Sequence, residues 1–502
     1  MLDKKNDRLI TLTDATVKYR NQILFSGLNL VLRQGEQWAV TGPAGSGKSA
    51  LLQALAGQYR LAAGKIEYPF YERRRRTHPV TDPLFSPQHL MARVEARHDF
   101  TSRAKTAAFF YQQRFNAGYA DQAPTVDDYL AEQAAGLETD AGWPLAGIYE
   151  IFDLEPLRHK HLIQLSTGEN RRLRLGAALL KNPRLLLLDD PLGGLDTATR
   201  ESLEDIFGRI AAAGITLVLT TGPEQIPGVI THVAALGEDR RLRTFSRADF
   251  SPPRQDNHTL VDLATARLRR LMTRRNQKRF SVLVAMKNAR VAYGETIIFE
   301  NINWTVRPGE CWALTGPNGS GKSTLLSLIN GDHPQAYAND ITLFDRPRGS
   351  GESIWEIKRR IGFMSPELDQ YFPRRYTCLQ TVESGFYDTI GLFTRSRPEN
   401  RALAEQWLAI LGLASCRDIP LQELSTSRQR LCLLARALVK KPALLMLDEP
   451  CLGFDRRQQH QFREIIDQIA AMGELGIIYV THHQETLPTG ITHALKLHGM
   501  TK

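Results

Sequence analysis

The sequence predicts an α/β protein made of two similar domains, each built on a mostly parallel sheet covered by helices. Three observations favour this fold class. The chain contains one long internal repeat; each copy has a glycine-rich turn between a short apolar run and a helical segment; and each copy has a wholly apolar run that ends in an acidic residue. A wholly apolar run is typical of a strand that is buried on both faces, as in parallel sheets.

The repeat defines the domain organisation. Residues 17–57 align with residues 291–331 without a gap, and residues 165–183 align in the same way with residues 424–442. A repeat of this length indicates two globular domains rather than a solenoid. We expect the first domain in residues 1–250, a basic linker in residues 251–280 and the second domain in residues 281–502. The linker, which begins with a Pro-Pro pair and a polar cluster, is interpreted as a surface helix or a tether.

Composition excludes several classes of protein. The 502 residues are 42% hydrophobic and 24% charged, which is ordinary for a globular chain and excludes disorder, collagen and coiled coil. We find no apolar run of the about 18–20 residues that span a bilayer and no apolar core of a secretory signal at the start. The five cysteines, all between Cys311 and Cys451, show no paired metal spacing and fit a reducing cytosol.

The net charge of +10 is a weak indication of an anionic partner in a chain of this length. Four consecutive arginines, Arg73 to Arg76, are interpreted as an exposed surface, with a docking patch as the less favoured alternative.

The first element to justify is a strand, a loop and a helix in each copy. In the first copy we expect a strand at residues 37–41 and a helix at residues 50–57. The loops between these elements match G-x-x-x-x-G-K-[ST] and consist of Gly42, Pro43, Ala44, Gly45, Ser46, Gly47, Lys48 and Ser49, and of Gly316, Pro317, Asn318, Gly319, Ser320, Gly321, Lys322 and Ser323. Such a loop turns backbone N–H groups toward phosphate oxygens, the lysine reaches the β- and γ-phosphates, and the serine binds Mg²⁺.

The second element is the apolar strand at residues 185–188 and at residues 444–447. These strands end at Asp189 and Asp448, which we expect to serve as Mg²⁺ ligands at the carboxyl edge of the sheet. The next residue is Asp190 in the first copy and Glu449 in the second. A carboxylate here polarises an attacking water, and the longer Glu449 is the better candidate for a catalytic base.

Residues 165–169 read LSTGE and resemble the LSGGQ signature of the ATP-binding cassette ATPases. Together with the phosphate loops and acidic strands, this identifies the chain as similar to tandem members of that family. The resemblance implies two P-loop NTPase domains, each with an added antiparallel β subdomain and a helical signature subdomain, and it implies ATP and Mg²⁺ as ligands.

The resemblance also carries residue roles. Signature residues are Ser166, Thr167, Gly168 and Glu169 in the first copy and Ser425 in the second; Tyr19 and Tyr293 resemble the adenine-stacking aromatic, although a plain core tyrosine is the alternative; His482 resembles the catalytic switch histidine; and Gln112 or Gln113 resembles the glutamine that senses the γ-phosphate. In the second copy that glutamine is missing, and either Glu367, Gln370 or no side chain takes its place.

Departures from the family pattern predict two unequal sites. Ser427 replaces the signature glycine in the second copy, whereas Asp190 and Thr221 stand where the second copy has Glu449 and His482. Family members pair the phosphate loop of one cassette with the signature of the other. All three departures then fall in one site, so we expect one hydrolytic site and one site that holds ATP. The alternative is that both sites turn over.

Two functional classes remain. Residues 331–368 are similar to the tandem cassette proteins associated with molybdate transport, which implies a cytoplasmic ATPase subunit at the inner face of the plasma membrane that energises a membrane permease. The alternative is a soluble ATP-dependent switch that acts on a ribosome, a nucleic acid or a regulatory protein. Both classes use the chain as an intramolecular pair of cassettes.

Overall fold

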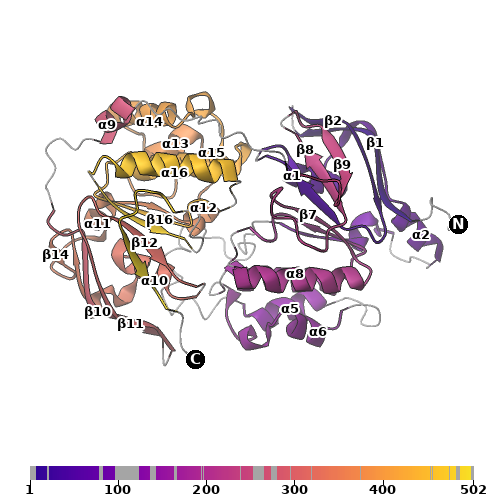
Figure 1. The fold of residues 1–502 in the computed structure, drawn as a ribbon, viewed down its shortest axis with the longest axis horizontal. Coiled ribbons are helices and arrows are strands. Elements are labelled where there is room, and N and C mark those ends of the chain that lie inside the picture. Colours follow the sequence, from indigo (N-terminus) through magenta and orange to yellow (C-terminus); the bar gives the residue numbers. More distant parts are fainter. Residues whose placement is uncertain are drawn as a thin grey trace. The chain divides into compact units, whose positions relative to one another are not determined.

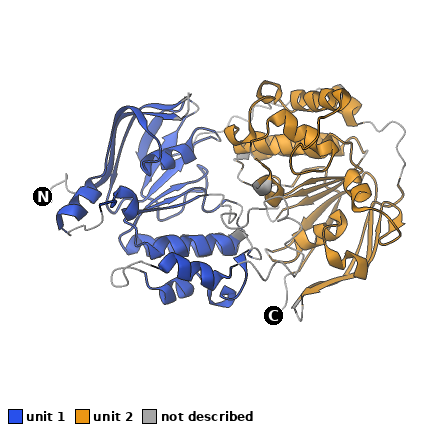
Figure 2. Cartoon of the chain, turned by 180° about the vertical axis from the view of Figure 1, so that it is seen from behind, with its two compact units in different colours: residues 1–98, 121–254 blue, residues 99–120, 255–502 orange. Residues whose placement is uncertain are grey.

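The computed structural model describes most of the chain. The described residues are 7–19, 22–43, 45–77, 83–95, 124–135, 143–162, 165, 167–193, 195, 197–237, 239–252, 265–272, 280–293, 296–317, 319–373, 375–452, 454, 456–473, 475–481 and 487–498. They form two compact units, one before residue 253 and one from residue 265 onward (Figure 2). Each unit is described below by itself.

The first unit contains two sheets and two groups of helices (Figure 1). Its strands are β1 (Arg8–Tyr19), β2 (Gln22–Arg33), β3 (Trp38–Thr41), β4 (Leu61–Glu67), β5 (Met91–Val94), β6 (Leu185–Leu188), β7 (Thr216–Thr220), β8 (His232–Leu236) and β9 (Leu242–Ser246). Its helices are α1 (Lys48–Leu55), α2 (Pro69–Thr77), α5 (Val126–Ala134), α6 (Leu145–Ile151), α7 (Thr167–Leu180) and α8 (Thr197–Ala212).

The larger sheet of the first unit has the order β5-β6-β7-β3-β8-β9 and is parallel except for β9. Strand β6, which lies between β5 and β7, is four leucines, all buried. The smaller sheet is antiparallel, with the order β2-β1-β4. Helix α7 packs against α5 and α6 in a separate helical group.

The second unit repeats this architecture. Its strands are β10 (Val284–Tyr293), β11 (Thr296–Val306), β12 (Cys311–Thr315), β13 (Asp340–Leu343), β14 (Arg346–Pro347), β15 (Ile361–Met364), β16 (Leu444–Asp448), β17 (Gly476–Val480) and β18 (His493–Lys496). Its helices are α9 (Thr265–Met272), α10 (Lys322–Asn330), α11 (Ile354–Arg360), α12 (Pro366–Tyr371), α13 (Cys378–Glu383), α14 (Pro398–Ile410), α15 (Thr426–Leu438) and α16 (Arg456–Ala470).

The parallel sheet of the second unit has the order β15-β16-β17-β12-β18, and the antiparallel sheet has the order β11-β10-β13-β14. Helices α13, α14 and α15 form the helical group. Both units therefore show the predicted fold class, a mostly parallel sheet with an antiparallel β subdomain and a helical subdomain.

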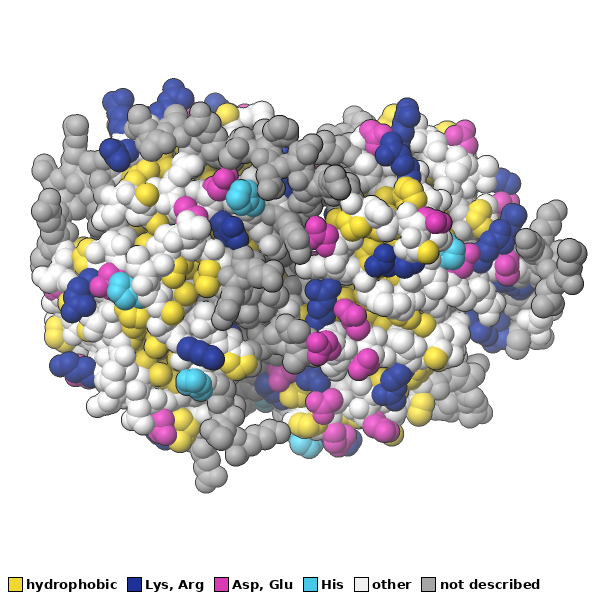
Figure 3. Space-filling view, viewed as in Figure 1, with side chains coloured by type: hydrophobic (Ala, Val, Ile, Leu, Met, Phe, Trp, Pro, Cys, Tyr) yellow, Lys and Arg dark blue, Asp and Glu magenta, His cyan; other side chains and the backbone are white. Residues whose placement is uncertain are grey.

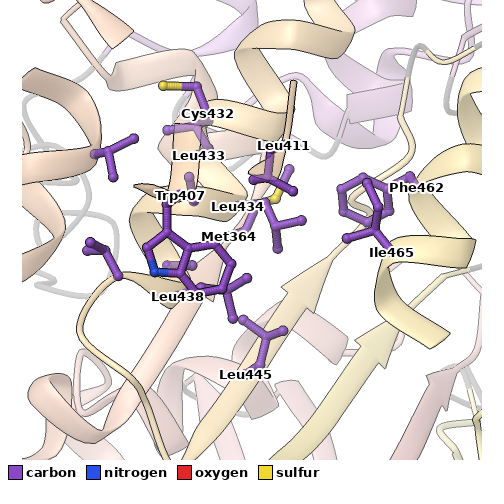
Figure 4. Packing of buried hydrophobic residues seen from close by; sticks show 14 of the residues in the cluster. Met364, Trp407, Leu411, Cys432, Leu433, Leu434, Leu438, Leu445, Phe462 and Ile465 are labelled. Atoms are coloured by element: carbon purple, nitrogen blue, oxygen red, sulfur yellow. The ribbon is translucent and has the colours of Figure 1, made fainter. Parts of the chain in front are cut away.

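A large apolar core joins the sheet of the second unit to its helical group (Figure 4). Trp407 of α14 is 1% exposed and lies among Leu434 and Leu438 of α15 and Leu445 of β16. All five cysteines of the chain belong to this unit; each is a buried free thiol. The core fixes α15 relative to the strand that carries Asp448.

Matching contacts in the two units extend the repeat beyond the aligned segments. Trp38 stacks on His232 with ring centroids 4.8 Å apart, and Trp312 stacks on His493 at 4.7 Å. The indole N–H of each tryptophan donates to a glutamate two residues earlier, with a donor–acceptor distance of 3.0 Å in both units. These pairs tie the strand before each phosphate loop to the neighbouring strand of the sheet.

The expected linker contains a packed helix. Helix α9 buries Leu268, Leu271 and Met272 in the core of the second unit, while Arg269 and Arg270 are exposed. Residues 265–272 therefore belong to the second unit and are not a tether. The pattern of the segment, with leucines spaced among arginines, is that of an amphipathic helix.

Surface charge is mixed on the visible face of the molecule. Among the described residues in Figure 3, basic and acidic side chains are interspersed on both units. Of the four arginines expected to be exposed, Arg75 and Arg76 at the end of α2 are exposed, whereas Arg73 and Arg74 are half-buried. Within the described part of the chain, no helix is both long and apolar enough to cross a bilayer.

Candidate functional site

Each phosphate loop leads from a central strand into a helix. Helix α1 begins at Lys48 and α10 begins at Lys322, and the preceding Gly47 and Gly321 have φ of 102° and 89°. A side chain at Gly321 would also collide, because a Cβ there would lie 2.8 Å from Ile298 Cγ2. The loop thus needs glycine for both its backbone conformation and its close packing.

The lysine ammonium lies inside the loop in both units. Lys48 Nζ donates to the carbonyl oxygens of Gly42 and Pro43, at 2.8 and 3.0 Å. Lys322 Nζ donates to the equivalent carbonyls at 2.8 Å each. A positive charge is therefore held where the loop closes, the position that suits a phosphate oxygen.

Two buried hydroxyls inside the loops suit an anionic ligand. Ser46 is 4% exposed and Ser320 is 0% exposed. Neither Oγ has a hydrogen-bond partner among the described residues. Buried polar atoms are normally satisfied, so these hydroxyls indicate a ligand oxygen at each loop.

The serine and aspartate expected to bind Mg²⁺ are in contact. Ser49 Oγ donates to Asp189 Oδ1 at 2.9 Å, and Ser323 Oγ donates to Asp448 Oδ2 at 3.0 Å. The described residues contain no group of three or more His, Cys, Asp or Glu side chains that could hold a metal ion. One hydroxyl and one carboxylate fit Mg²⁺, which keeps several waters and takes further ligands from phosphates.

Asp190 has a carboxylate that is turned back into its own unit. A Cβ at Gly193 would lie 2.1 Å from Asp190 Oδ2, so this carboxylate covers the Gly193 Cα. Burial raises the pKa of Asp190, and the charge of Arg171 opposes that rise. The Asp190 carboxylate therefore interacts with residues of the first unit.

Asp448 lies close to other acidic side chains. It is 4% exposed, and burial, followed by the charges of Glu367 and Glu449, raises its pKa to about 7. The effect of Glu367 shows that the first turn of α12 is electrostatically close to the end of β16. Of the two sensing-loop candidates in the second copy, Glu367 is thus near the site; the side chain of Gln370 is outside the described residues.

Strand register corrects the position of Thr221. Leu188 pairs with Leu219 and Leu447 pairs with Tyr479, and the two aspartates follow these pairs. Counting from them, Thr221 matches Thr481, and Gly222 matches His482. Our expectation that Thr221 replaces the histidine is wrong, because the repeat is shifted by one residue there. Gly222 has no side chain at all, so the first copy still lacks the imidazole.

Thr221 has a structural contact instead. It is 4% exposed, and its Oγ1 donates to the Gln225 carbonyl at 2.9 Å. The preceding Thr220 donates its hydroxyl to Asp189 Oδ1 at 2.8 Å. Sequence analysis missed Thr220, whose equivalent in the second unit is Val480.

The signature segments begin a helix in both units. Helix α7 starts at Thr167 and α15 starts at Thr426, with Ser425 as its N-cap. In the first unit Glu169 pairs with Lys160 at 2.8 Å. In the second unit Ser427 Oγ lies 3.2 Å from Ser425 Oγ, so the residue that replaces the signature glycine interacts with its neighbour.

An arginine links each signature helix to the end of the acidic strand; Arg171 is half-buried and Arg430 is buried. Arg171 Nη1 donates to the Pro191 carbonyl at 2.8 Å, and Arg430 Nη1 approaches the Glu449 carbonyl at 3.4 Å. Arg430 also pairs with Asp369 at 3.4 Å. These arginines were not among the expected site residues, although they occupy matching positions in the aligned repeat.

Tyr293 is placed as an exposed ring. It ends β10 and is 45% exposed, and its hydroxyl is 2.8 Å from His333 Nε2. The half-exposed ring excludes the alternative of a plain core tyrosine. The side chain of Tyr19, its counterpart, lies outside the described residues.

Some expected residues cannot be placed. Outside the described residues lie Ala44, Gln112, Gln113, Ser166, Asn318 and His482, as well as the side chain of Thr167. Strand β5 ends at Val94 in the same register as Met364 of β15, since they pair with Leu188 and Leu447. The chain therefore reaches this edge of the sheet well before Gln112.

Comparison with known proteins agrees with this geometry. Residues 25–193 and 299–452 match the ABC transporter family. The chain is 35% identical to the ABC transporter ATP-binding protein ModF of Escherichia coli (strain K12), over 93% of this chain and 92% of that protein. It is 29% identical to the uncharacterized ABC transporter ATP-binding protein C323.04 of Schizosaccharomyces pombe, over 93% of each chain.

A solved structure, the model of ribosome-bound archaeal Pelota and ABCE1, shares the fold. Its TM-score is 0.55 at 17% identity, and the match covers 93% of this chain and 73% of that chain. Two cassette regions and a full-length relative establish the identity. The chain is a tandem member of the ABC transporter family and, like the cassette proteins of that family, it is an ATPase.

Proposed function

We propose that this chain hydrolyses ATP chiefly at the phosphate loop of its second unit and uses that reaction to energise an import permease. The observation that carries the unequal activity is the contrast between the two residues that follow the acidic strands. Asp190 is short and its carboxylate covers Gly193, whereas Glu449 carries one more methylene at the same backbone position.

In the hydrolytic site, Lys322 and the loop amides bind the β- and γ-phosphates. Ser323 Oγ and Asp448 Oδ2, which are 3.0 Å apart, would hold Mg²⁺, and the bound ion would supply positive charge to offset that of the phosphates. Glu449 orients and deprotonates the attacking water, and His482 contacts the γ-phosphate. By family resemblance, the signature of the first unit at residues 165–169 completes this site.

In the other site, Lys48, Ser49 and Asp189 bind ATP and Mg²⁺ without efficient hydrolysis. In this site the carboxylate of Asp190 is one methylene shorter than that of a glutamate. Gly222 stands in place of the histidine, and Ser427 stands in place of the signature glycine. A fused pair permits this division, which a homodimer of identical cassettes does not, because its two halves can carry different substitutions.

The transport role is supported by the relative ModF, which is named an ABC transporter ATP-binding protein. In this role the chain acts on the cytoplasmic side of the plasma membrane and a separate polypeptide supplies the membrane-spanning helices. The similarity of residues 331–368 to molybdate-associated cassette proteins makes molybdate the first cargo to test.

Affinity purification of the Glu449→Gln form with ATP tests the transport role. We expect this ATP-locked form to retain a multi-spanning permease from solubilised membranes, and the binding to be lost with Lys322→Ala, which cannot hold ATP in the same site. Recovery of ribosomes or nucleic acid in place of a permease would overturn the transport role and support the soluble switch.

A further inference from the structure

His333 lies immediately beyond the helix that follows the second phosphate loop. It is 1% exposed and comes two residues after Gly331, which caps α10. Its Nε2 is 2.8 Å from the hydroxyl of Tyr293, and its Nδ1 accepts the backbone N–H of Gln335 at 3.2 Å. The histidine thus connects the residue that ends β10 to the turn that follows α10.

The hydrogen bonds determine the tautomer of this histidine. A backbone N–H can only donate, so Nδ1 must be the unprotonated nitrogen. Burial lowers the pKa of His333 to about 4, and the ring is therefore neutral near pH 7. A neutral imidazole with a bare Nδ1 carries its proton on Nε2. His333 consequently donates to the Tyr293 oxygen and leaves the tyrosine hydroxyl proton facing elsewhere.

A second set of bonds holds the backbone beside Tyr293. Gln335 Nε2 donates to the Ala292 carbonyl at 2.7 Å, and its Oε1 accepts the Ala292 N–H at 3.2 Å. Both backbone polar groups of Ala292, the residue before the tyrosine, are therefore hydrogen-bonded to Gln335. The tyrosine is held at its backbone by Gln335 and at its hydroxyl by His333.

The ring that is held in this way belongs to an element that packs on the second phosphate loop. Tyr293 is 45% exposed. It belongs to the β10–β11 hairpin, in which it pairs with Thr296. The same hairpin touches the phosphate loop, since a Cβ at Gly321 would meet Ile298 at 2.8 Å and Phe299 at 2.9 Å. An aromatic face is thus presented from an element that packs on the loop.

We propose that His333 is a positioning residue that orients the Tyr293 ring to stack on the base of a purine nucleotide in the second phosphate loop. This role rests on the proposed function, because it assumes that ATP binds and turns over at that loop. A ring fixed before binding loses less conformational freedom when the base arrives, which increases affinity. The chemistry of the phosphates is untouched by this contact.

The first unit differs at this position. Tyr59 and His333 each lie two residues beyond the end of the aligned repeat, at Gly57 and Gly331, and so occupy corresponding places in the chain. The Tyr59 hydroxyl donates to the Gln53 side chain on α1, so its hydroxyl is directed to the helix. The first unit therefore has no histidine in the place of His333, and a change at Tyr59 provides a matched control.

Equilibrium binding of ATP in the Glu449→Gln background tests the proposal without turnover. We expect His333→Ala to weaken ATP binding at the second site about 3- to 10-fold, the range of one net hydrogen bond. Tyr293→Phe, which keeps the ring and removes the acceptor, should give a similar loss. The double variant should bind ATP no more weakly than the weaker-binding single variant. His333→Gln, which retains a hydrogen-bond donor, should recover part of the ATP affinity.

Tripolyphosphate, which has no base, is the discriminating probe. Its dissociation constant should be the same for the parent and for His333→Ala. Tyr59→Phe should change the binding of neither tripolyphosphate nor ATP. In steady-state hydrolysis, His333→Ala should raise KM for ATP and leave kcat unchanged. Equal weakening of ATP and tripolyphosphate would overturn the proposal, because it would indicate a damaged loop rather than a misplaced ring.

The failure of this role is distinguishable from failure of the proposed function. If Tyr293→Ala weakens ATP binding but His333→Ala does not, stacking is retained and the positioning role is wrong. If Tyr293→Ala has no effect on ATP, the base does not stack on this ring and the positioning role is equally wrong. Hydrolysis that survives Glu449→Gln would instead contradict the proposed function.

Discussion

Asp190 and Glu449 share one backbone conformation, with φ of 46° in both residues. Asp190 follows Asp189, the first residue after β6, and Glu449 follows Asp448, the last residue of β16. This left-handed region is uncommon for residues other than glycine and marks positions where the surrounding structure dictates the backbone. The two residues therefore differ in the length of the side chain and its contacts, not in the way that the chain presents them.

Removal of the carboxylate from these two residues should have unequal effects. We expect Glu449→Gln to lower kcat for ATP at least about 100-fold, because a base that activates water contributes that much or more. Asp190→Asn should change kcat less than about 2-fold, within the scatter of a residue outside the catalytic step. Phosphate release by the purified chain measures both, and similar losses would contradict the unequal sites.

The signature segments offer a reciprocal exchange. A Cβ at Gly168 would lie 3.2 Å from Thr199 Cγ2, so Gly168→Ser forces a small displacement. We expect this change to lower ATPase activity at least about 10-fold, because small misplacements in a catalytic site are costly. Ser427→Gly removes a side chain from the other signature and should alter activity less than about 2-fold by the same reasoning. A larger effect of Ser427→Gly would place hydrolysis in the other pairing.

His333 should make the second unit sensitive to acid. Burial lowers its folded-state pKa from 6.5 to about 4, so the unfolded chain binds more protons between these values. The stability contributed by the neutral ring is present above pH 6.5 and is lost as pH falls toward 4. We expect this group to lower the free energy of unfolding by up to about 1 kcal/mol between pH 7 and pH 5, less than the full shift implies because solvent screens the charge. Denaturant unfolding of His333→Gln at the two pH values should show a correspondingly smaller difference than the parent.

Helix α9 should contribute to the stability of the second unit. Leu268 is 0% exposed in the core, so Leu268→Ala should lower the free energy of unfolding by about 2–4 kcal/mol. Arg270 lies on the exposed face of the same helix, and Arg270→Ala should change stability by less than about 0.5 kcal/mol. Thermal unfolding resolves the two cases. A tether without packing would give equally small effects for both variants.

The sequence predicted those parts of the site that depend on local spacing. The phosphate loops and the aspartates at the carboxyl ends of β6 and β16 could be named because each motif specifies both its element and its neighbour. Helix α1 begins at Lys48 and not at residue 50, because Gly47 supplies the left-handed turn that starts the helix. Such boundaries depend on backbone geometry that composition does not encode.

Other parts of the site depend on contacts between distant segments. The one-residue error at Thr221 arose because the strand register is set by pairing with β6, not by the threonines that both copies share. The contact between Tyr293 and His333 joins residues that are 40 positions apart. The burial of α9 likewise requires its partner α14, which lies more than a hundred residues later in the chain. None of these relationships has a signal in a single local pattern.

The distribution of thiols gives the chain an internal reporter. All five cysteines are buried in the second unit, and the sequence of the first unit contains none. An alkylating reagent can therefore modify the folded chain only through openings of one half. The rate of thiol labelling with and without ATP would measure how strongly nucleotide suppresses opening of the second unit. The first unit, which has no cysteine, would not be labelled.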